Sequence, residues 1–228
     1  MMIEILENAD LAAIKAASII AEEARKSVAL RGCFILAVSG GKTPWKMLRA
    51  LADEDVPWEG MNILQVDERL APEGHPDRNM THLHESLSGV IPLLAGRIHA
   101  MPVEEKVPEA VAAAYAQTIS EIAGSPAIID LIHLGLGPDG HTASLIPGDP
   151  VLDVTDRDVA LTGIYQGRHR LTLTYSVINR ARKILWLITG GEKNEMLQRL
   201  LESDFSIPAG RISQEHAMVL ADKDAAYQ

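Results

Sequence analysis

Short apolar runs alternate along this chain with longer amphipathic segments. The runs cover residues 33–38, 61–66, 128–134 and 184–189, and each leads into a segment of glycine or charged residues. Apolar runs of this length, rich in β-branched residues and bounded by turn-forming residues, are typical of strands buried on both faces of a parallel sheet. We expect these runs to be strands, with a further short strand at 217–221.

The segments between these runs show helical periodicity. Small and aliphatic residues recur every three or four positions in 10–31, where Asp10 is placed to cap the first turn and Gly32 to end the helix. The alanine-rich segment 107–123 and residues 194–201 are also expected to be helical. Strands that alternate with helices predict a doubly wound α/β fold with a mainly parallel sheet.

Two weaker strand patterns lie late in the chain. Residues 159–163 are expected to be a strand, and the alternation of leucine and threonine in 171–174 predicts a strand that is half-buried. No internal repeat and no long linker divides the chain, so residues 1–228 are expected to form a single domain.

Composition narrows the classes of function. Of the 228 residues, 47% are hydrophobic, yet no apolar run approaches the roughly 20 residues of a membrane span. The first residues lack the basic segment of a secretory signal and the single Cys33 excludes an internal disulfide, so a cytoplasmic location is expected. A net charge of −10 disfavours nucleic acid, so neither nucleic acid nor membrane is an expected partner. The sequence does not reveal an oligomeric state, and a monomer is favoured.

The most distinctive stretch is Gly-Leu-Gly-Pro-Asp-Gly-His at 135–141. Its glycines and proline force a sharp turn at the end of the strand predicted before it. Loops at the carboxyl ends of parallel strands form the ligand crevice of an open α/β sheet. Asp139 and His141, two residues apart in this loop, can therefore act on one substrate. Histidine is the side chain best suited to transfer a proton near neutral pH.

A second glycine turn, Ser39-Gly40-Gly41-Lys42-Thr43, follows the first apolar run and leads into a helix. Glycines let backbone N–H groups approach an anion, and a helix N-terminus favours negative charge, so this turn can cradle a phosphate. Lys42 and Thr43 add further donors. The spacing is neither that of a Walker A loop nor that of a dinucleotide fingerprint. From these residues alone, a purely structural turn is the favoured interpretation.

Charged residues also gather where other strands are predicted to end. Asp67, Glu68 and Arg69 come directly after the run at 61–66, where they face either the ligand crevice or solvent. A chain with a net negative charge needs a local cluster of cations to bind an anionic substrate. The candidates for that cluster are Arg168, Arg170 and Lys193.

The stretch GLGPDGHTASLIPG, at 135–148, closely resembles the signature loop of the 6-phosphogluconolactonases. They belong to a wider group of sugar-phosphate enzymes that includes glucosamine-6-phosphate deaminase. The deaminases have a related loop that continues with Ile-Ala-Phe-Asn, whereas this chain continues with Thr-Ala-Ser-Leu at 142–145, the lactonase form. Residues 39–44 resemble the first lactonase motif, and Asn79 and the segment 170–174 match further family segments. The proline-rich stretch that usually precedes the latter is missing.

This resemblance implies a Rossmann-like fold without a bound nucleotide. It also implies hydrolysis of 6-phospho-D-glucono-1,5-lactone to 6-phosphogluconate, a step of the pentose phosphate pathway. His141 would be the general base that activates water, and Asp139 would orient it. Backbone N–H groups of residues 135–140 or a nearby arginine would stabilise the oxyanion. No cofactor or metal is expected, because a lactone is already activated and His82 and His84 do not share a helical face.

The motifs and the resemblance together predict a set of residues that bind the lactone and its phosphate. They are Ser39, Gly40, Gly41, Lys42, Thr43, Asp67, Glu68, Arg69, Asn79, Gly135, Gly137, Gly140, Thr142, Ser144, Arg168, Arg170 and Lys193. Two alternatives stay open: a sugar-phosphate isomerase or deaminase of the same fold, and a non-catalytic sugar-phosphate sensor. The lactonase form of the loop argues against the first, and the intact Asp139–His141 pair argues against the second.

Overall fold

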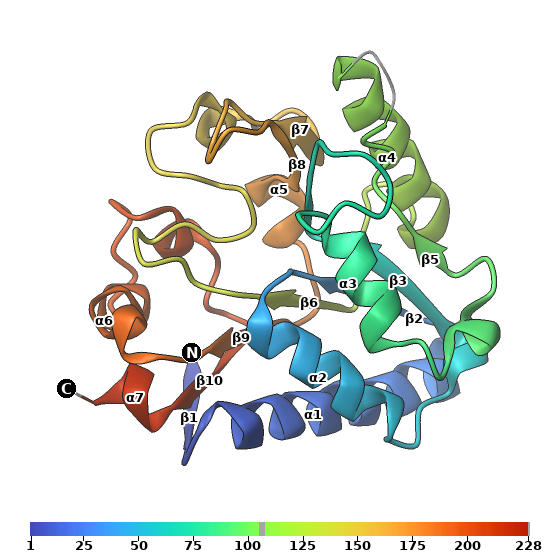
Figure 1. Ribbon diagram of the computed structural model, residues 1–228, viewed down its shortest axis with the longest axis horizontal. Coiled ribbons are helices and arrows are strands. Elements are labelled where there is room, and N and C mark those ends of the chain that lie inside the picture. The colour runs from blue at the N-terminus through green and yellow to red at the C-terminus, as the bar shows by residue number, and fades with distance from the viewer. Residues whose placement is uncertain (105–107, 228) are drawn as a thin grey trace.

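The computed structural model describes residues 1–104 and 108–227 (Figure 1). Its strands are β1 Met2–Leu6, β2 Phe34–Val38, β3 Met61–Gln65, β4 Asp67–Arg69, β5 Ile98–His99, β6 Leu131–Leu134, β7 Val159–Leu161, β8 Arg170–Leu173, β9 Ile184–Ile188 and β10 Ala217–Asp222. Its α-helices are α1 Ala9–Arg31, α2 Lys42–Ala52, α3 Asn79–Ser86, α4 Pro108–Ala123, α5 Tyr175–Ile178, α6 Asn194–Leu201 and α7 Lys223–Ala226. The first residue of the predicted helix 107–123, Val107, lies outside the described residues.

A seven-stranded sheet forms the centre of the molecule, in the order β1-β10-β9-β6-β2-β3-β5. Every neighbouring pair in this sheet is parallel. The predicted mainly parallel α/β sheet is therefore confirmed. The edge strands β1 and β5 were not predicted, because β1 is largely exposed and β5 has only two residues, so neither forms a buried apolar run.

The chain reverses its direction across the sheet between β2 and β6, which lie side by side. From β2 it proceeds to β3 and β5 on one side, and after β6 it proceeds to β9 and β10 on the other. The loops that leave β2 and β6 therefore diverge. Such a switch point opens a crevice at the carboxyl ends of the strands.

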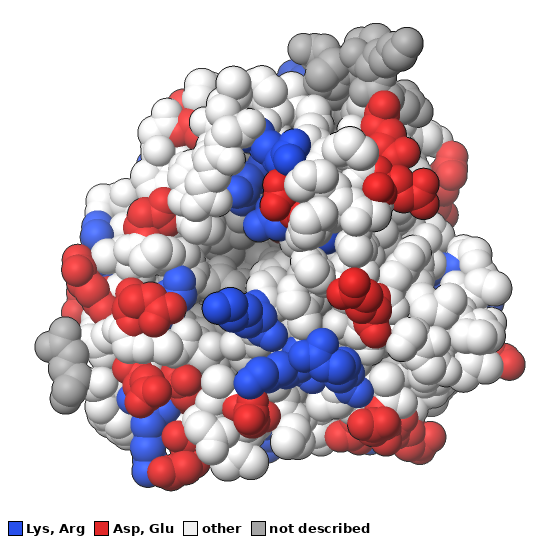
Figure 2. Space-filling model, viewed as in Figure 1, with Lys and Arg blue, Asp and Glu red and all other residues white. Residues whose placement is uncertain are grey.

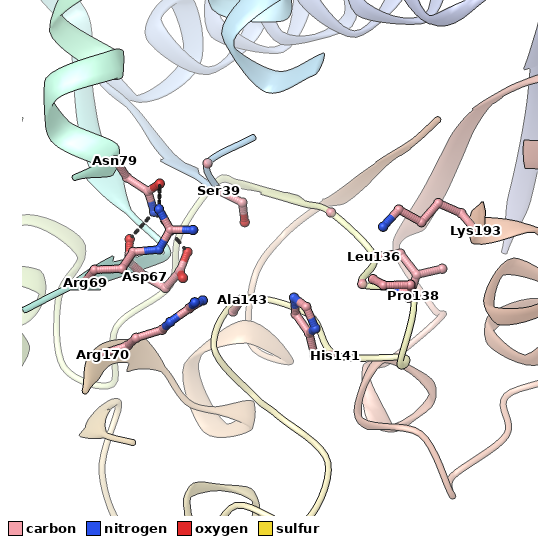
Figure 3. Close-up of a pocket in the computed structure, with 13 residues that line it drawn as sticks. Ser39, Asp67, Arg69, Asn79, Leu136, Pro138, His141, Ala143, Arg170 and Lys193 are labelled. Atoms are coloured by element: carbon pink, nitrogen blue, oxygen red, sulfur yellow. Dashed lines mark hydrogen bonds between the residues drawn. The ribbon is translucent and has the colours of Figure 1, made fainter. Parts of the chain in front are cut away.

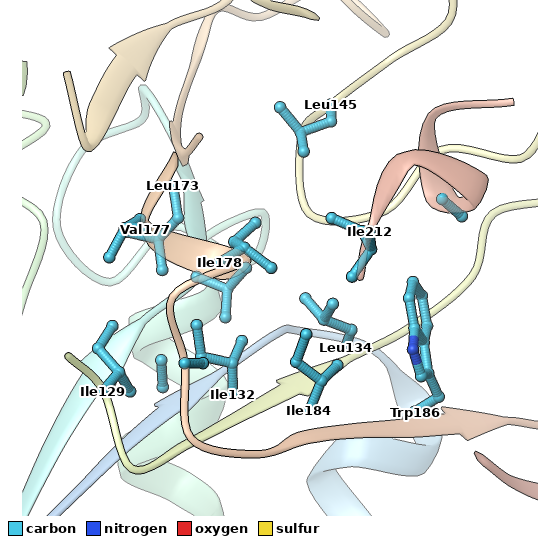
Figure 4. Close-up of a cluster of buried hydrophobic side chains, with 14 of the residues drawn as sticks. Ile129, Ile132, Leu134, Leu145, Leu173, Val177, Ile178, Ile184, Trp186 and Ile212 are labelled. Atoms are coloured by element: carbon cyan, nitrogen blue, oxygen red, sulfur yellow. The ribbon is translucent and has the colours of Figure 1, made fainter. Parts of the chain in front are cut away.

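Alternate residues of the central strands face two different cores. Phe34 and Leu36 pack with α1, α2 and α3, whereas Ile35 and Ala37 pack in a second cluster on the opposite face. Figure 4 shows part of that second cluster, where Trp186 lies near Ile212. Helices cover both faces, so the strands are apolar at nearly every position, as the sequence pattern predicts.

Helix α1 starts earlier than predicted. The expectation that Asp10 caps it is wrong: the side-chain oxygen of Asn8 accepts a hydrogen bond from the Leu11 N–H at 3.0 Å. Asparagine is as good a cap as aspartate, so sequence preference could not separate the two. The predicted stop at Gly32 is confirmed, with φ of 77° and an N–H bond to the Val28 carbonyl.

A second, antiparallel sheet of three strands, in the order β4-β8-β7, lies beside the carboxyl end of the main sheet. Residues 67–69, expected only to follow the strand at 61–66, form a strand of their own, β4. The prediction that 171–174 is half-buried is wrong, since every residue of β8 is buried. Leu171 and Leu173 enter the hydrophobic core, while Thr172 accepts a hydrogen bond from the Ser144 N–H of the loop above it.

None of the helices within 1–104 and 108–227 combines the length and the apolar character that crossing a membrane demands.

His133 on β6 is a fully buried titratable residue next to Ser39, which follows β2. Its Nδ1 accepts a hydrogen bond from the Ser39 N–H at 3.3 Å, so Nε2 carries the hydrogen. That Nε2 is buried without a hydrogen-bond partner. Burial lowers the pKa of His133 from 6.5 to about 3, so the ring is neutral in the folded protein.

We therefore expect His133 to make the folded protein less stable in mild acid. The unfolded chain binds a proton at His133 below a pKa of about 6.5, whereas the folded chain does not until about pH 3. The free energy of unfolding should fall by about 1.4 kcal/mol between pH 7.5 and 5.5 because of this residue. Urea unfolding of His133→Leu should lack that part of the pH dependence, and His216→Leu, at an exposed site, should retain it. Equal pH slopes for wild type and His133→Leu would refute this assignment.

Candidate active site

A pocket of about 170 Å³ lies at the carboxyl ends of β2 and β6, where the chain reverses direction. Figure 3 shows its wall of charged and polar side chains. The residues that line it are Ser39, Gly40, Asp67, Arg69, Asn79, Gly135, Leu136, Gly137, Pro138, His141, Ala143, Arg170 and Lys193. Segments far apart in the sequence thus meet at one site, as a switch point predicts.

Positive charge surrounds the hollow although the whole chain has a net charge of −10. Figure 2 shows lysine and arginine side chains around the middle of this face, while aspartate and glutamate lie mostly toward its edge. Three cations, Arg69, Arg170 and Lys193, line the pocket itself. The site therefore has the local charge that an anionic ligand needs.

The loop after β6 folds tightly on itself and presents His141. The Gly137 N–H donates to the His141 carbonyl at 2.7 Å, and the Gly140 N–H donates to the Gly137 carbonyl at 3.1 Å. The Thr142 hydroxyl donates to the Gly135 carbonyl at 2.8 Å. These bonds fix the backbone around His141, so the imidazole is held on a rigid turn.

Gly137 makes room for the imidazole. A Cβ atom on Gly137 would lie 2.2 Å from His141 Nδ1, far inside van der Waals contact. Glycine is needed here because the ring packs directly against the backbone, and not because of an unusual φ.

Asp139 orients His141. Its Oδ1 lies 2.5 Å from His141 Nδ1 and accepts from the His141 backbone N–H at 3.1 Å. Burial raises the pKa of Asp139, but the hydrogen bonds and charge of His141 outweigh it, and the net pKa is lowered. The carboxylate is therefore ionised and can only accept, so Nδ1 carries the hydrogen. Nε2 is then the nitrogen available to take a proton.

Two arginines form the opposite wall. Arg69 of β4 and Arg170 of β8 are directly paired across the antiparallel ladder. Burial and the charge of Arg69 both lower the pKa of Arg170. Like charges that face each other in this way are destabilising, so the pair concentrates unneutralised positive charge at this wall of the pocket.

A chain of hydrogen bonds supports this wall. The Ser144 hydroxyl donates to the buried Asp67 carboxylate at 2.6 Å, and the Asn79 amide donates to the Asp67 carbonyl at 3.0 Å. Arg69 donates in turn to the Asn79 side-chain oxygen at 3.2 Å. A Cβ on Gly40 would lie 2.0 Å from that oxygen, so the glycine lets the loop after β2 touch Asn79.

Lys193 enters from the other side of the pocket. It ends a short 3₁₀ turn, Gly191–Lys193, that follows β9. In Figure 3 the side chains of Lys193 and Arg170 point inward from opposite sides, with His141 between them. The cations and the Asp139–His141 pair, called the proton-transfer pair below, can therefore contact different groups of one ligand.

Several residues predicted to bind substrate lie outside the lining. Glu68 is fully buried and does not reach the pocket. Its carboxylate accepts from the Asn79 and Met80 backbone N–H groups at 2.8 and 2.9 Å, which caps the first turn of α3, and it pairs with Arg78. It is therefore corrected from a ligand-binding residue to a helix cap, because β4 turns successive side chains to opposite faces.

The remaining predicted residues outside the lining support the walls or face solvent. Thr43 makes a 2.7 Å hydroxyl contact with Thr189, which joins the start of α2 to the end of β9. Arg168 pairs with Asp77 at 2.8 Å on the surface. The other residues in this group are Gly41 and the exposed Lys42 at the start of α2, the buried Gly140 and Thr142 in the loop after β6, and Ser144 behind Asp67.

Three lining residues, Leu136, Pro138 and Ala143, were not predicted as site residues. They lie in the loop at 135–148 that the sequence analysis singles out, so their closeness to His141 in the sequence could have indicated them. Tyr165 was also missed. Its hydroxyl lies 3.4 Å from Asp139 and its ring stands edge-on to His141, but nothing local in the sequence indicates that contact.

Within the described residues no group of three or more histidine, cysteine, aspartate or glutamate side chains is arranged to hold a metal ion.

Comparison with known proteins agrees with this architecture. A curated 6-phosphogluconolactonase of Synechocystis is 36% identical over 199 residues, covering 86% of this chain and 82% of its own. A 6-phosphogluconolactonase structure from Thermotoga maritima superposes with a TM-score of 0.84 at 26% identity, over 97% of this chain and 98% of its own. A monomeric glucosamine-6-phosphate deaminase superposes with a TM-score of 0.86 at 20% identity, over 99% of both chains, and so shares the fold.

The fold and the pocket define an α/β protein with a charged site at the switch point of a parallel sheet. The chain belongs to the family described as glucosamine-6-phosphate isomerases/6-phosphogluconolactonase, whose profile matches residues 7–221.

The packing of Gly137 against His141 generates a test of the site. Gly137→Ala should displace the imidazole and reduce catalytic turnover by roughly 10²-fold or more, because proton transfer depends on close positioning. Stability should change little, since the substitution meets one side chain that can move. Gly89→Ala, where a Cβ meets nothing within 4 Å, is the matched control. Unchanged turnover in Gly137→Ala, at wild-type melting temperature, would contradict the placement of His141.

Proposed function

We propose that this chain hydrolyses 6-phospho-D-glucono-1,5-lactone to 6-phosphogluconate, a step of the pentose phosphate pathway, with His141 as the general base. The lactonase activity follows from its relatives, which carry that name at up to 36% identity over most of the chain. The observation that supports the role of His141 is its short contact with the ionised Asp139 in a pocket lined by three cations.

The fold alone does not distinguish this activity from a deaminase, because both activities occur on it. The loop after β6 favours the lactonase, since Thr142 and Ser144 stand where deaminases continue differently. In this chain both residues make structural bonds, Thr142 to Gly135 and Ser144 to Asp67. Residues 142–145 therefore help to hold the walls of this pocket in place.

In the proposed reaction, Nε2 of His141 takes a proton from water as the water oxygen attacks the lactone carbonyl carbon. The carbonyl electrons move to its oxygen and form a tetrahedral oxyanion. When the intermediate collapses, the bond to the ring oxygen breaks and the His141 imidazolium returns the proton to that oxygen. Asp139 stabilises the imidazolium between the two transfers, as carboxylates do in hydrolytic triads.

The phosphate is proposed to bind to Arg170 and Lys193, with the Gly40 backbone at the start of the loop before α2. Arg69, paired with Arg170, adds charge at the same wall. Two backbone donors suggested for the oxyanion, the Gly137 and Gly140 N–H groups, are already bonded within the loop. The other backbone N–H groups of residues 135–140 or an arginine would then stabilise the oxyanion, so Arg170 has to be assigned to one end of the substrate or the other.

We propose that residues 1–228 work as a single domain and a monomer. A cytoplasmic location remains a prediction from the sequence.

The test of the function is turnover of lactone generated in situ, compared with spontaneous hydrolysis. The wild-type chain should accelerate it, and His141→Asn should lose about 10²- to 10⁴-fold of the rate with binding nearly intact, because asparagine cannot accept the proton. The matched control is His216→Asn at an exposed site.

Two results would contradict this proposal. Retention of more than about a tenth of the turnover in His141→Asn would remove His141 as the base, since a general base contributes at least 10²-fold. Release of ammonia from glucosamine 6-phosphate, without lactone turnover, would identify a deaminase.

A second experiment assigns Arg170. Arg170→Ala should lower kcat/KM for the phosphorylated lactone by about tenfold or more, because a charge-assisted hydrogen bond worth about 1.5–3 kcal/mol is lost. It should change kcat/KM for unphosphorylated gluconolactone far less, since that substrate lacks the phosphate. Arg157→Ala, at a surface ion pair, is the control. Equal fractional losses in kcat/KM for both lactones would contradict the phosphate contact and indicate that Arg170 contacts the lactone carbonyl.

A further inference from the structure

We propose that Tyr165 is a positioning residue that holds the Asp139–His141 pair and Arg170 in one arrangement across the pocket. This inference rests on the lactonase activity proposed above and adds a residue to it.

Tyr165 contacts both members of the proton-transfer pair. Its hydroxyl lies 3.4 Å from Asp139 Oδ2, the carboxylate oxygen that His141 does not use. Its ring meets the His141 ring edge-on, with centroids 5.8 Å apart and planes at 67°. Edge-to-face contacts of this kind are favourable for aromatic pairs. Tyr165 therefore contacts Asp139 through its hydroxyl and His141 through its ring.

The same ring contacts the opposite wall. The Arg170 guanidinium carbon lies 4.9 Å from the centre of the Tyr165 ring, a cation–π geometry. The neighbouring Gln166 accepts a hydrogen bond from Arg170 Nη2 at 3.1 Å. Both contacts aim the guanidinium, whose Nε is buried without a hydrogen-bond partner.

The backbone around Tyr165 is a tight hairpin, so these contacts are held in place. Tyr165 and Arg168 form an antiparallel bridge, with the Tyr165 N–H donating to the Arg168 carbonyl at 2.9 Å. Gln166 and Gly167 between them have φ of 52° and 81°, as in the two-residue turns that favour hairpins. The hairpin leads directly into β8, which starts at Arg170.

The hydroxyl also affects the charge of the pair. Burial and the nearby Asp139 charge raise the pKa of Tyr165, so it stays protonated and donates to the carboxylate. That donation reduces the charge that Asp139 offers to the His141 imidazolium. The other charged groups that face the pair across the pocket are Arg69, Arg170, Lys193 and Asp67.

Tyr165→Phe tests the hydroxyl with the ring retained. Without the donor, Asp139 holds the imidazolium more strongly, so the acid limb of the kcat/KM profile for the phosphorylated lactone should move to higher pH. Tyr227→Phe, at an exposed tyrosine, is the control. An unchanged acid limb in Tyr165→Phe would overturn the contact with the pair.

Tyr165→Leu tests the ring. Loss of the cation–π contact should raise KM for the phosphorylated lactone by about threefold or more, and should affect unphosphorylated lactone less. Equal fractional loss for both substrates would overturn the positioning of Arg170. Wild-type turnover is measured separately, so an unchanged pH profile or KM in an active wild-type background counts against this inference, whereas absent wild-type turnover counts against the lactonase assignment. Wild-type melting temperatures for both variants establish that they fold.

Discussion

The parallel pairing of β2 with β6 is the constraint on which the rest of this molecule depends. Since the chain leaves these neighbouring strands in opposite directions, their loops cannot cover the space above them. The pocket occupies that space, with Gly40 on one side and the Gly135–His141 turn on the other. The apolar core needs only buried strands, but the site needs these two strands to be adjacent. The position of the pocket is therefore a consequence of topology, and its chemistry depends on which side chains the loops carry.

The antiparallel sheet β4-β8-β7 provides two of the positive charges that line the pocket. Its β4–β8 pairing places Arg69 beside Arg170, against the repulsion of two like charges. Buried Asp67 stands behind them and partly compensates, since its charge favours the protonated form of Arg170. Asn79 and Ser144 hold Asp67 and Arg69 through hydrogen bonds. The repulsion between the two arginines is a local cost to stability, and such costs are common at sites where function and folding compete.

The Asp139–His141 pair differs from the arginine pair, because it is held mostly by contacts between residues close together in the chain. Asp139 and His141 are two residues apart, and the loop closes on itself through backbone hydrogen bonds. Gly137 lets the imidazole lie against the backbone. The short carboxylate contact fixes the tautomer of His141, so Nε2 is the nitrogen available to take a proton.

The buried central strands, the longer helices and the Asp139–His141 pair could be predicted from the sequence because each depends on residues close together in the chain. Apolar runs identify buried strands, and glycine turns identify loops, whatever surrounds them. The sequence could not decide which charged residues reach the pocket, since Glu68 and Arg69 are adjacent yet one caps α3 and the other lines the site. That outcome depends on the register of β4 against β8, which pairs distant segments and turns alternate side chains to opposite faces. The contact of Tyr165 with Asp139 arises in the same way, from a hairpin that only the folded chain brings to the loop after β6.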